Sequence, residues 1–133
     1  MSSKKHVRYR CLIQVSVLIV LALISGCKTD KKHTAIVTAT AYNSIPGQTT
    51  KQNHDIGAWG DKLKPGMKAI AVSRDLIKKG LTHNTKVKIE GLKGEYVVLD
   101  KMNKRWKKKI DIYMGTDVEA AREWGKRKVR ITW

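Results

Sequence analysis

Two aspartates in the C-terminal half of the chain occupy positions where a carboxylate is unexpected. Asp100 ends the apolar segment 96–99, and Asp111 lies between Ile110 and Ile112. Strands disfavour carboxylates, and partial burial between two isoleucines would raise the pKa of Asp111. A carboxyl group that keeps its proton near neutral pH can donate it to a leaving oxygen, as cleavage of a glycosidic bond requires. The alternative is a structural ion pair with one of the lysines just before it, which would lower that pKa instead.

Side chains in two loops are candidates for binding a sugar. Trp106 and Asn103 lie in the basic loop 101–109 that separates the two aspartates, and Trp59 lies in the long loop 43–66. An indole ring can stack on the C–H face of a sugar, although an indole in a loop can equally cover the end of a hydrophobic core. The histidines lack the spacing of metal ligands. The sequence therefore predicts neither a metal nor a cofactor.

The segments that must position these residues are short. Most alternate apolar and polar side chains, and two, 68–73 and 96–99, are apolar runs; both patterns are typical of strands. One helical turn is expected at 74–79. A second helix is expected to begin at an N-cap, Thr116, with Glu119 completing a capping box. Six strands, two short helices and no repeat predict an all-β domain built as a small closed barrel, because closure removes exposed strand edges. The predicted strands are 36–42, 68–73, 85–90, 95–100, 110–114 and 126–133.

Most of the chain resembles the three-aspartate (3D) domain, a family that includes the barrel of membrane-bound lytic transglycosylases. In that family an aspartate that ends one strand is followed, eleven positions later, by an aspartate in an Ile-Asp-hydrophobic-Tyr strand, and then by a helix that ends in an aromatic-Gly-basic turn. The resemblance covers about residues 36–133. The motifs that carry it are Asp100, Ile110-Asp111-Ile112-Tyr113 and the segment 121–129, with weaker likeness at 41–42 and 70–74.

The resemblance implies a six-stranded double-psi β-barrel that acts as a peptidoglycan lytic transglycosylase. Such an enzyme cleaves the β-1,4 bond between N-acetylmuramic acid and N-acetylglucosamine, and the sugar's own 6-hydroxyl closes a 1,6-anhydro ring. One carboxyl can serve as acid and then as base, outside the usual two-carboxylate scheme. The resemblance makes Asp111 the catalytic acid and Asp100 its supporting aspartate.

The sequence departs from the family at two places. The family often has Asp-Thr-Gly-Gly where Asp100 is here followed by Lys101-Met102-Asn103, so the groove must differ. The family's third aspartate falls at Ser73, and the nearest acid is Asp75. Asp75 is therefore a candidate for contacting the substrate in place of the missing acid. Because one of the three defining acids is absent, a non-catalytic envelope protein that binds peptidoglycan stays the alternative function.

The N-terminus predicts export and lipid attachment. Basic residues at positions 4–10 precede the apolar run 12–24, which ends in Ile24-Ser25-Gly26-Cys27. This pattern marks a secretory signal and resembles the lipobox of bacterial lipoproteins. A membrane span needs roughly 20 apolar residues, and a plain cleaved signal would leave Cys27 unexplained. We expect a signal peptide at 1–26, a tether at 27–35 lipidated on Cys27, and the 3D barrel at 36–133.

The chain is strongly basic, with a formal net charge of +17. In an exported protein this charge favours attraction to lipid headgroups and peptidoglycan carboxylates over binding to nucleic acid. Lys28 follows the lipidated cysteine where an aspartate would retain a lipoprotein at the inner membrane. By resemblance to such sorting signals, this favours the outer membrane, facing the periplasm. The expected partners are peptidoglycan glycan strands and the membrane, with no nucleic acid.

Overall fold

The computed structural model describes residues 31–45 and 55–133. The predicted signal peptide 1–26 and the predicted lipidation site Cys27 lie outside these residues, so both stay predictions. Within the described ranges, no helix is long and apolar enough to cross a membrane.

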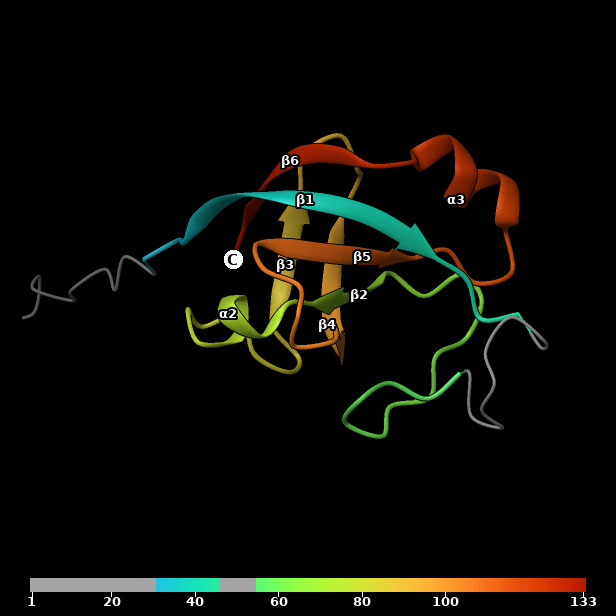
Figure 1. Ribbon diagram of the computed structural model, residues 1–133, viewed down its shortest axis with the longest axis horizontal. Coiled ribbons are helices and arrows are strands. Elements are labelled where there is room, and N and C mark those ends of the chain that lie inside the picture. The colour runs from blue at the N-terminus through green and yellow to red at the C-terminus, as the bar shows by residue number, and fades with distance from the viewer. Residues whose placement is uncertain (1–30, 46–54) are drawn as a thin grey trace, which may run out of the picture. The chain divides into compact units, whose positions relative to one another are not determined.

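Short segments, alternating or wholly apolar, form the strands, largely as their sequence pattern predicts. The elements are β1 (Thr34–Tyr42), β2 (Ala69–Val72), α2 (Arg74–Ile77), β3 (Lys86–Ile89), β4 (Glu95–Lys101), β5 (Lys109–Tyr113), α3 (Val118–Trp124) and β6 (Arg127–Thr132). The six strands of the described part close into a barrel in the order β1-β5-β2-β4-β3-β6 (Figure 1). Two neighbouring pairs, β1 with β5 and β2 with β4, are parallel, and the other pairs are antiparallel. The predicted closed six-stranded barrel is confirmed.

Every second residue of each strand fills the inside of the barrel. Val37 and Ala39 of β1 are buried in the main core together with Ile110 and Ile112 of β5. Side chains alternate between the two faces of a strand, so the residues between these apolar ones project from the outer face. Asp111 is one of them, which explains how a carboxylate can lie in an otherwise apolar strand.

A β-bulge in β4 changes the face on which Asp100 lies. Ile70 of β2 is paired with Val98, but the next residue, Ala71, is paired with Asp100, so Leu99 is skipped. An extra residue re-aims the side chains that follow it. Val98 points into the barrel, and without the bulge Asp100 would do the same. With the bulge, Asp100 shares the outer face with Ala71.

The skipped residue belongs to a second, smaller core outside the barrel. Leu99 is buried there with Leu63, Ala69 and Tyr113. The loop that carries Leu63 also contacts the bulge directly, because a Cβ added to Gly57 would overlap the carbonyl oxygen of Leu99. Burial of Leu99 under this loop therefore stabilises the bulge and brings the loop next to Asp100.

Two expectations about where elements begin need correction. The second helix does not begin at Thr116. Its N-cap is Asp117, whose carboxylate accepts a hydrogen bond of 2.9 Å from the Ala120 N–H, because a turn closed by the Asp117 N–H and the Met114 carbonyl comes first. The predicted capping box with Glu119 is therefore absent. In addition, β1 begins at Thr34, inside the segment expected to be tether.

Candidate functional site

The strand register places four residues side by side across four strands. Thr40 of β1 is paired with Asp111 of β5, Asp111 with Ala71 of β2, and Ala71 with Asp100 of β4. Paired residues point to the same face of a sheet, so all four side chains project outward. Two strand spacings, roughly 10 Å in total, separate the Cα atoms of the two aspartates. Only the methyl group of Ala71 lies between them, which leaves room for a ligand.

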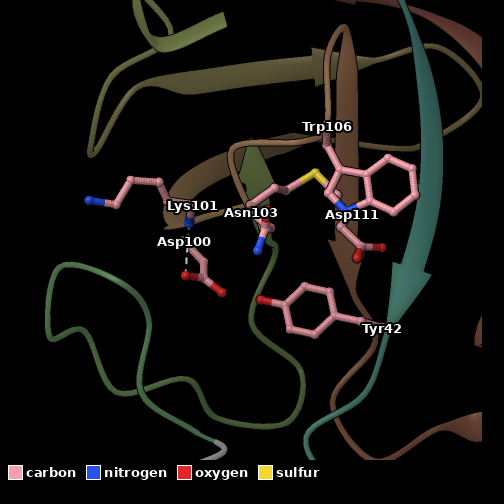
Figure 2. A pocket seen from close by; sticks show the side chains of 8 residues that line it. Tyr42, Asp100, Lys101, Asn103, Trp106 and Asp111 are labelled. Carbon is pink, nitrogen blue, oxygen red and sulfur yellow. Dashed lines mark hydrogen bonds between the residues drawn. The ribbon is translucent and has the colours of Figure 1, made fainter. Parts of the chain in front are cut away.

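An open pocket of about 210 Å³ lies over this row. Figure 2 shows Tyr42 and Trp106 on either side of Asp111, and the Tyr42 hydroxyl points toward Asp100. The structure thus brings together four of the residues singled out in the sequence, Asp100, Asn103, Trp106 and Asp111. The lining residues are Tyr42, Ala71, Asp100, Lys101, Met102, Asn103, Trp106 and Asp111.

Asp111 is a partly buried carboxyl group whose pKa is raised above its ordinary value. Burial is the largest cause, and the negative charge of Asp100 also raises it. The Thr40 hydroxyl, which donates a hydrogen bond of 2.8 Å to Oδ1, and the positive charge of Lys109 act in the opposite direction. No ion pair among the described residues includes Asp111. Asp111 therefore holds its proton more tightly than an ordinary aspartate, which is the direction that a general acid needs.

Asp100 is held in one orientation by the backbone. Its Oδ1 accepts two hydrogen bonds, from the Ala58 N–H at 2.8 Å and the Lys101 N–H at 2.7 Å. Ala58 belongs to the loop that covers the bulge, so the loop and the bulge fix this carboxylate together. In Figure 2 the other carboxylate oxygen faces the Tyr42 side of the pocket. Asp100 can therefore accept a hydrogen bond from a ligand while its charge acts on Asp111.

Sequence reasoning missed Tyr42. Its hydroxyl is buried and has no hydrogen-bond partner among the described residues. Burial is the largest cause of a raised pKa at Tyr42, followed by the negative charges of Asp100 and Asp111. The phenol therefore keeps its proton and can donate a hydrogen bond to an acceptor on a bound ligand. Tyr42 has the same outward parity as Thr40 along β1, but no local pattern shows that β1 lies beside β5.

The loop between the two aspartates supplies the rim of the pocket. Trp106 is 38% exposed, with Lys109 Nζ 3.8 Å and Arg105 Cζ 5.0 Å from its ring centroid. Asn103 orders the loop, since its side-chain oxygen accepts the Arg105 N–H at 3.1 Å and its carbonyl accepts the Trp106 N–H at 3.1 Å. The amide nitrogen of Asn103 points into the pocket in Figure 2.

Trp59 does not line the pocket. Its ring stacks on His83 with centroids 4.8 Å apart, and Lys101 Nζ lies 5.1 Å from the indole centroid. His83 also contacts the Asp61 carboxylate at 2.6 Å. The indole of Trp59 therefore packs against side chains of the protein itself, His83 and Lys101. Trp59 therefore attaches the loop to the barrel at the edge of the pocket.

Ser73 and Asp75, at the position of the missing third acid, also lie outside the pocket lining. Ser73 is fully buried, and its hydroxyl accepts the Lys109 N–H at 3.1 Å. Asp75 accepts the Lys108 N–H at 3.0 Å. Burial tends to raise the pKa of Asp75, but hydrogen bonds from Ser73 and Lys108 and the charge of Lys107 outweigh it and lower the pKa. Both side chains hold the end of the basic loop.

The pocket therefore combines a carboxyl group with a raised pKa, an anchored carboxylate, a phenol that stays protonated and an exposed indole. These groups can transfer a proton to a bound ligand and accept or donate hydrogen bonds around it. Within residues 31–45 and 55–133, no three His, Cys, Asp or Glu side chains lie close enough together to hold a metal ion.

Comparison with known proteins identifies the fold. No family model matches the chain, and no curated protein sequence matches it. A solved structure does match, the apo crystal structure of an expansin from Clavibacter michiganensis, with a TM-score of 0.50 and 19% identity. The match covers 76% of this chain and 50% of the expansin chain, so this chain corresponds to about half of that protein. The described part of the chain is a six-stranded double-psi β-barrel with two short helices, as the sequence predicts.

Proposed function

We propose that this protein is a peptidoglycan lytic transglycosylase that acts in turnover of the cell wall. The observation that carries the proposal is the row of Thr40, Asp111, Ala71 and Asp100 at the base of an open pocket. It combines a proton donor with a second carboxylate on the far side of a small residue. The likeness of the sequence to the 3D domain supplies the substrate and the reaction.

In the proposed reaction Asp111 acts first as an acid and then as a base. Protonated Asp111 donates its proton to the glycosidic oxygen as the bond to the anomeric carbon of N-acetylmuramic acid breaks. The resulting carboxylate takes the proton of the 6-hydroxyl as that oxygen bonds to the same carbon and closes the 1,6-anhydro ring. Asp111 ends protonated, no water is consumed, and the reaction is balanced without a cofactor.

The neighbouring groups have supporting roles in this proposal. The charge of Asp100 opposes ionisation of Asp111 and stabilises positive charge that develops on the sugar ring. Tyr42 donates a hydrogen bond to a sugar oxygen, which gives an acceptor to a hydroxyl that has no partner among the described residues. Asn103 contacts the sugar from the rim, and Trp106 lies at the rim beside it.

The setting of this reaction is also part of the proposal. The sequence pattern of the signal segment and the lipobox supports attachment of the mature protein to a membrane through lipid on Cys27, and Lys28 favours the outer membrane. A short tether would keep the barrel within reach of the peptidoglycan layer beside that membrane.

The decisive experiment is mass spectrometry of sacculi digested with the purified full chain. We expect soluble muropeptides with 1,6-anhydro ends, and Asp111→Asn should lower their yield by at least about 10²-fold, the smaller effect typical of general acid catalysis. Glu119→Gln, which removes an exposed carboxylate from α3, is the matched control and should cleave normally. Products with reducing ends would indicate a hydrolase instead.

The alternative is binding to peptidoglycan without cleavage. Ser73 favours this alternative. It occupies the position of the family's third acid, but it is buried and its hydroxyl accepts a hydrogen bond from the Lys109 N–H. Under this alternative, wild-type protein and Asp111→Asn sediment equally with sacculi, and neither releases a soluble product across a range of pH.

A further inference from the structure

The loop between the two aspartates is a dense cluster of positive charge beside the pocket. It contains no acidic residue, and its basic side chains take part in none of the ion pairs among the described residues. Lys101 and Trp106 of this loop also line the pocket. The basic side chains of the segment are Lys101, Lys104, Arg105, Lys107, Lys108 and Lys109.

The backbone that carries these basic side chains is held by hydrogen bonds to Ser73 and Asp75. Ser73 and Lys109 exchange two hydrogen bonds, in which the Lys109 N–H donates to the Ser73 hydroxyl at 3.1 Å and the Ser73 N–H donates to the Lys109 carbonyl at 2.9 Å. Asp75 accepts the Lys108 N–H at 3.0 Å. The backbone of the loop is therefore anchored, while its cationic side chains form no ion pair with the described residues. This limits the entropy that would be lost on binding an anion.

The cations also occupy the surface on which a neutral sugar would stack. Lys109 Nζ lies 3.8 Å from the Trp106 ring centroid, and Arg105 Cζ lies 5.0 Å from it. A neutral sugar would have to share the indole with these cations or displace one. An anionic group can instead accept hydrogen bonds from them without breaking the cation–π contacts, and hydrogen bonds between charged groups are the stronger ones.

We propose that Arg105 and Lys109, arranged around Trp106, form a subsite for a carboxylate carried by the wall polymer, next to the sugar that contacts Asp111. The inference rests on the proposed peptidoglycan ligand and names the part of it that this loop recognises. Peptidoglycan offers this chemistry from two sources, the carboxylates of the peptide stem and the lactyl carboxylate that remains on the muramic acid when the stem is removed. A neutral polymer of N-acetylglucosamine offers neither.

The test is co-sedimentation of the full chain with insoluble polymers at fixed ionic strength, in an Asp111→Asn background so that cleavage does not release the protein. The polymers are sacculi stripped of phosphate-bearing polymers, the same sacculi with carboxyl groups converted to amides, sacculi treated with an amidase to remove the stems, and chitin. The variant Arg105→Gln/Lys109→Gln keeps Trp106. Its matched control, Lys126→Gln/Lys128→Gln, removes the same charge from an exposed position at β6 that does not line the pocket.

We expect amidation of the sacculi to weaken binding by roughly 10-fold, the effect of losing two surface charge pairs. The Arg105→Gln/Lys109→Gln variant should show the same loss on untreated sacculi and little further loss on amidated ones. Binding that survives amidase treatment assigns the lactyl carboxylate as the ligand, and binding that falls with the stems assigns the stem carboxylates. Circular dichroism of the variant checks that it is folded.

Three results would overturn the subsite. They are equal losses in the variant and its matched control, equally tight binding of the wild-type loop to chitin and sacculi, and binding that requires the phosphate-bearing polymers. The cleavage assay is independent of this one. If the protein needs carboxylates to bind but forms no anhydro product, the subsite is supported and the transglycosylase proposal is refuted. If it forms anhydro product and binds amidated sacculi as tightly as untreated ones, the transglycosylase proposal is supported and the subsite is refuted.

Discussion

Replacing Asp111 with asparagine should stabilise the folded protein at neutral pH. Asparagine keeps the shape of the side chain and an oxygen that accepts the Thr40 hydroxyl, which now lies 2.8 Å from Oδ1. The substitution removes a partly buried negative charge whose ionisation is disfavoured in the folded chain, as the raised pKa of Asp111 indicates. We expect a gain of about 1 kcal/mol in the free energy of unfolding, because partial exposure and Lys109 offset much of the cost of burial. For a domain of this size, that gain raises the Tm by about 4–8 °C.

The stabilisation should depend on pH in one direction. Below about pH 3.9, the ordinary pKa of an aspartate, Asp111 is protonated in both the folded and the unfolded chain, so the variant and the wild type differ little. As the pH rises through the raised pKa of Asp111 in the folded chain, the wild type loses stability relative to the variant, and above that pKa the difference is constant. Urea unfolding followed by tryptophan fluorescence, from about pH 3 to pH 8, measures this difference.

Glu119→Gln is the control for this measurement. It removes an exposed charge from the first turn of α3, where the helix dipole favours a negative charge, so it should slightly lower the stability. If Asp111→Asn instead lowers the stability at neutral pH, the charge of Asp111 stabilises the fold, as an ion pair with a neighbouring lysine would. That result would refute the raised pKa and with it the basis for the acid role.

Gly57→Ala should cost about 1–3 kcal/mol of stability in urea unfolding, as overpacking does. The Cβ of the alanine would overlap the backbone of the β4 bulge and displace the loop that donates a hydrogen bond to Asp100. A variant as stable as the wild type would show that the loop is not held there. Thr40→Val removes a hydrogen bond that lowers the pKa of Asp111, so the alkaline limb of the activity profile should move to higher pH, and a shift to lower pH would contradict the assignment. Cys27→Ser should release the protein from the membrane fraction, and an unchanged fractionation would refute lipid attachment.

Local patterns in the sequence were sufficient to predict the strands, because each strand either alternates apolar and polar side chains or is a short apolar run, as β2 is. The alternation around Asp111 also identified an acid held between two buried isoleucines, and burial of Ile110 and Ile112 follows from the same pattern. Where the prediction failed, two local signals competed. Thr116 and Asp117 are both good N-caps, and the turn from Met114 that decides between them is not visible in the sequence alone.

Only the tertiary structure decided which side chains share the pocket. Thr40 and Tyr42 reach the site because β1 pairs with β5, a contact between residues 71 positions apart in the case of Thr40 and Asp111. The loop that holds Trp106 suggested an exposed sugar-stacking ring, but the cations over that ring became evident only in three dimensions. Partners so distant in sequence are selected by packing of the whole core, which no local pattern contains.

Asp100 shows this limit most clearly. The sequence marked it as the end of an apolar strand, and simple alternation from Val98 would point its side chain into the barrel. A shift of one residue moves a side chain to the opposite face of a sheet. Here the shift comes from the bulge at Leu99, which is buried against Leu63 of a distant loop. The contact that puts both aspartates in one pocket therefore arises from packing outside the barrel, so the spacing between them cannot reveal it.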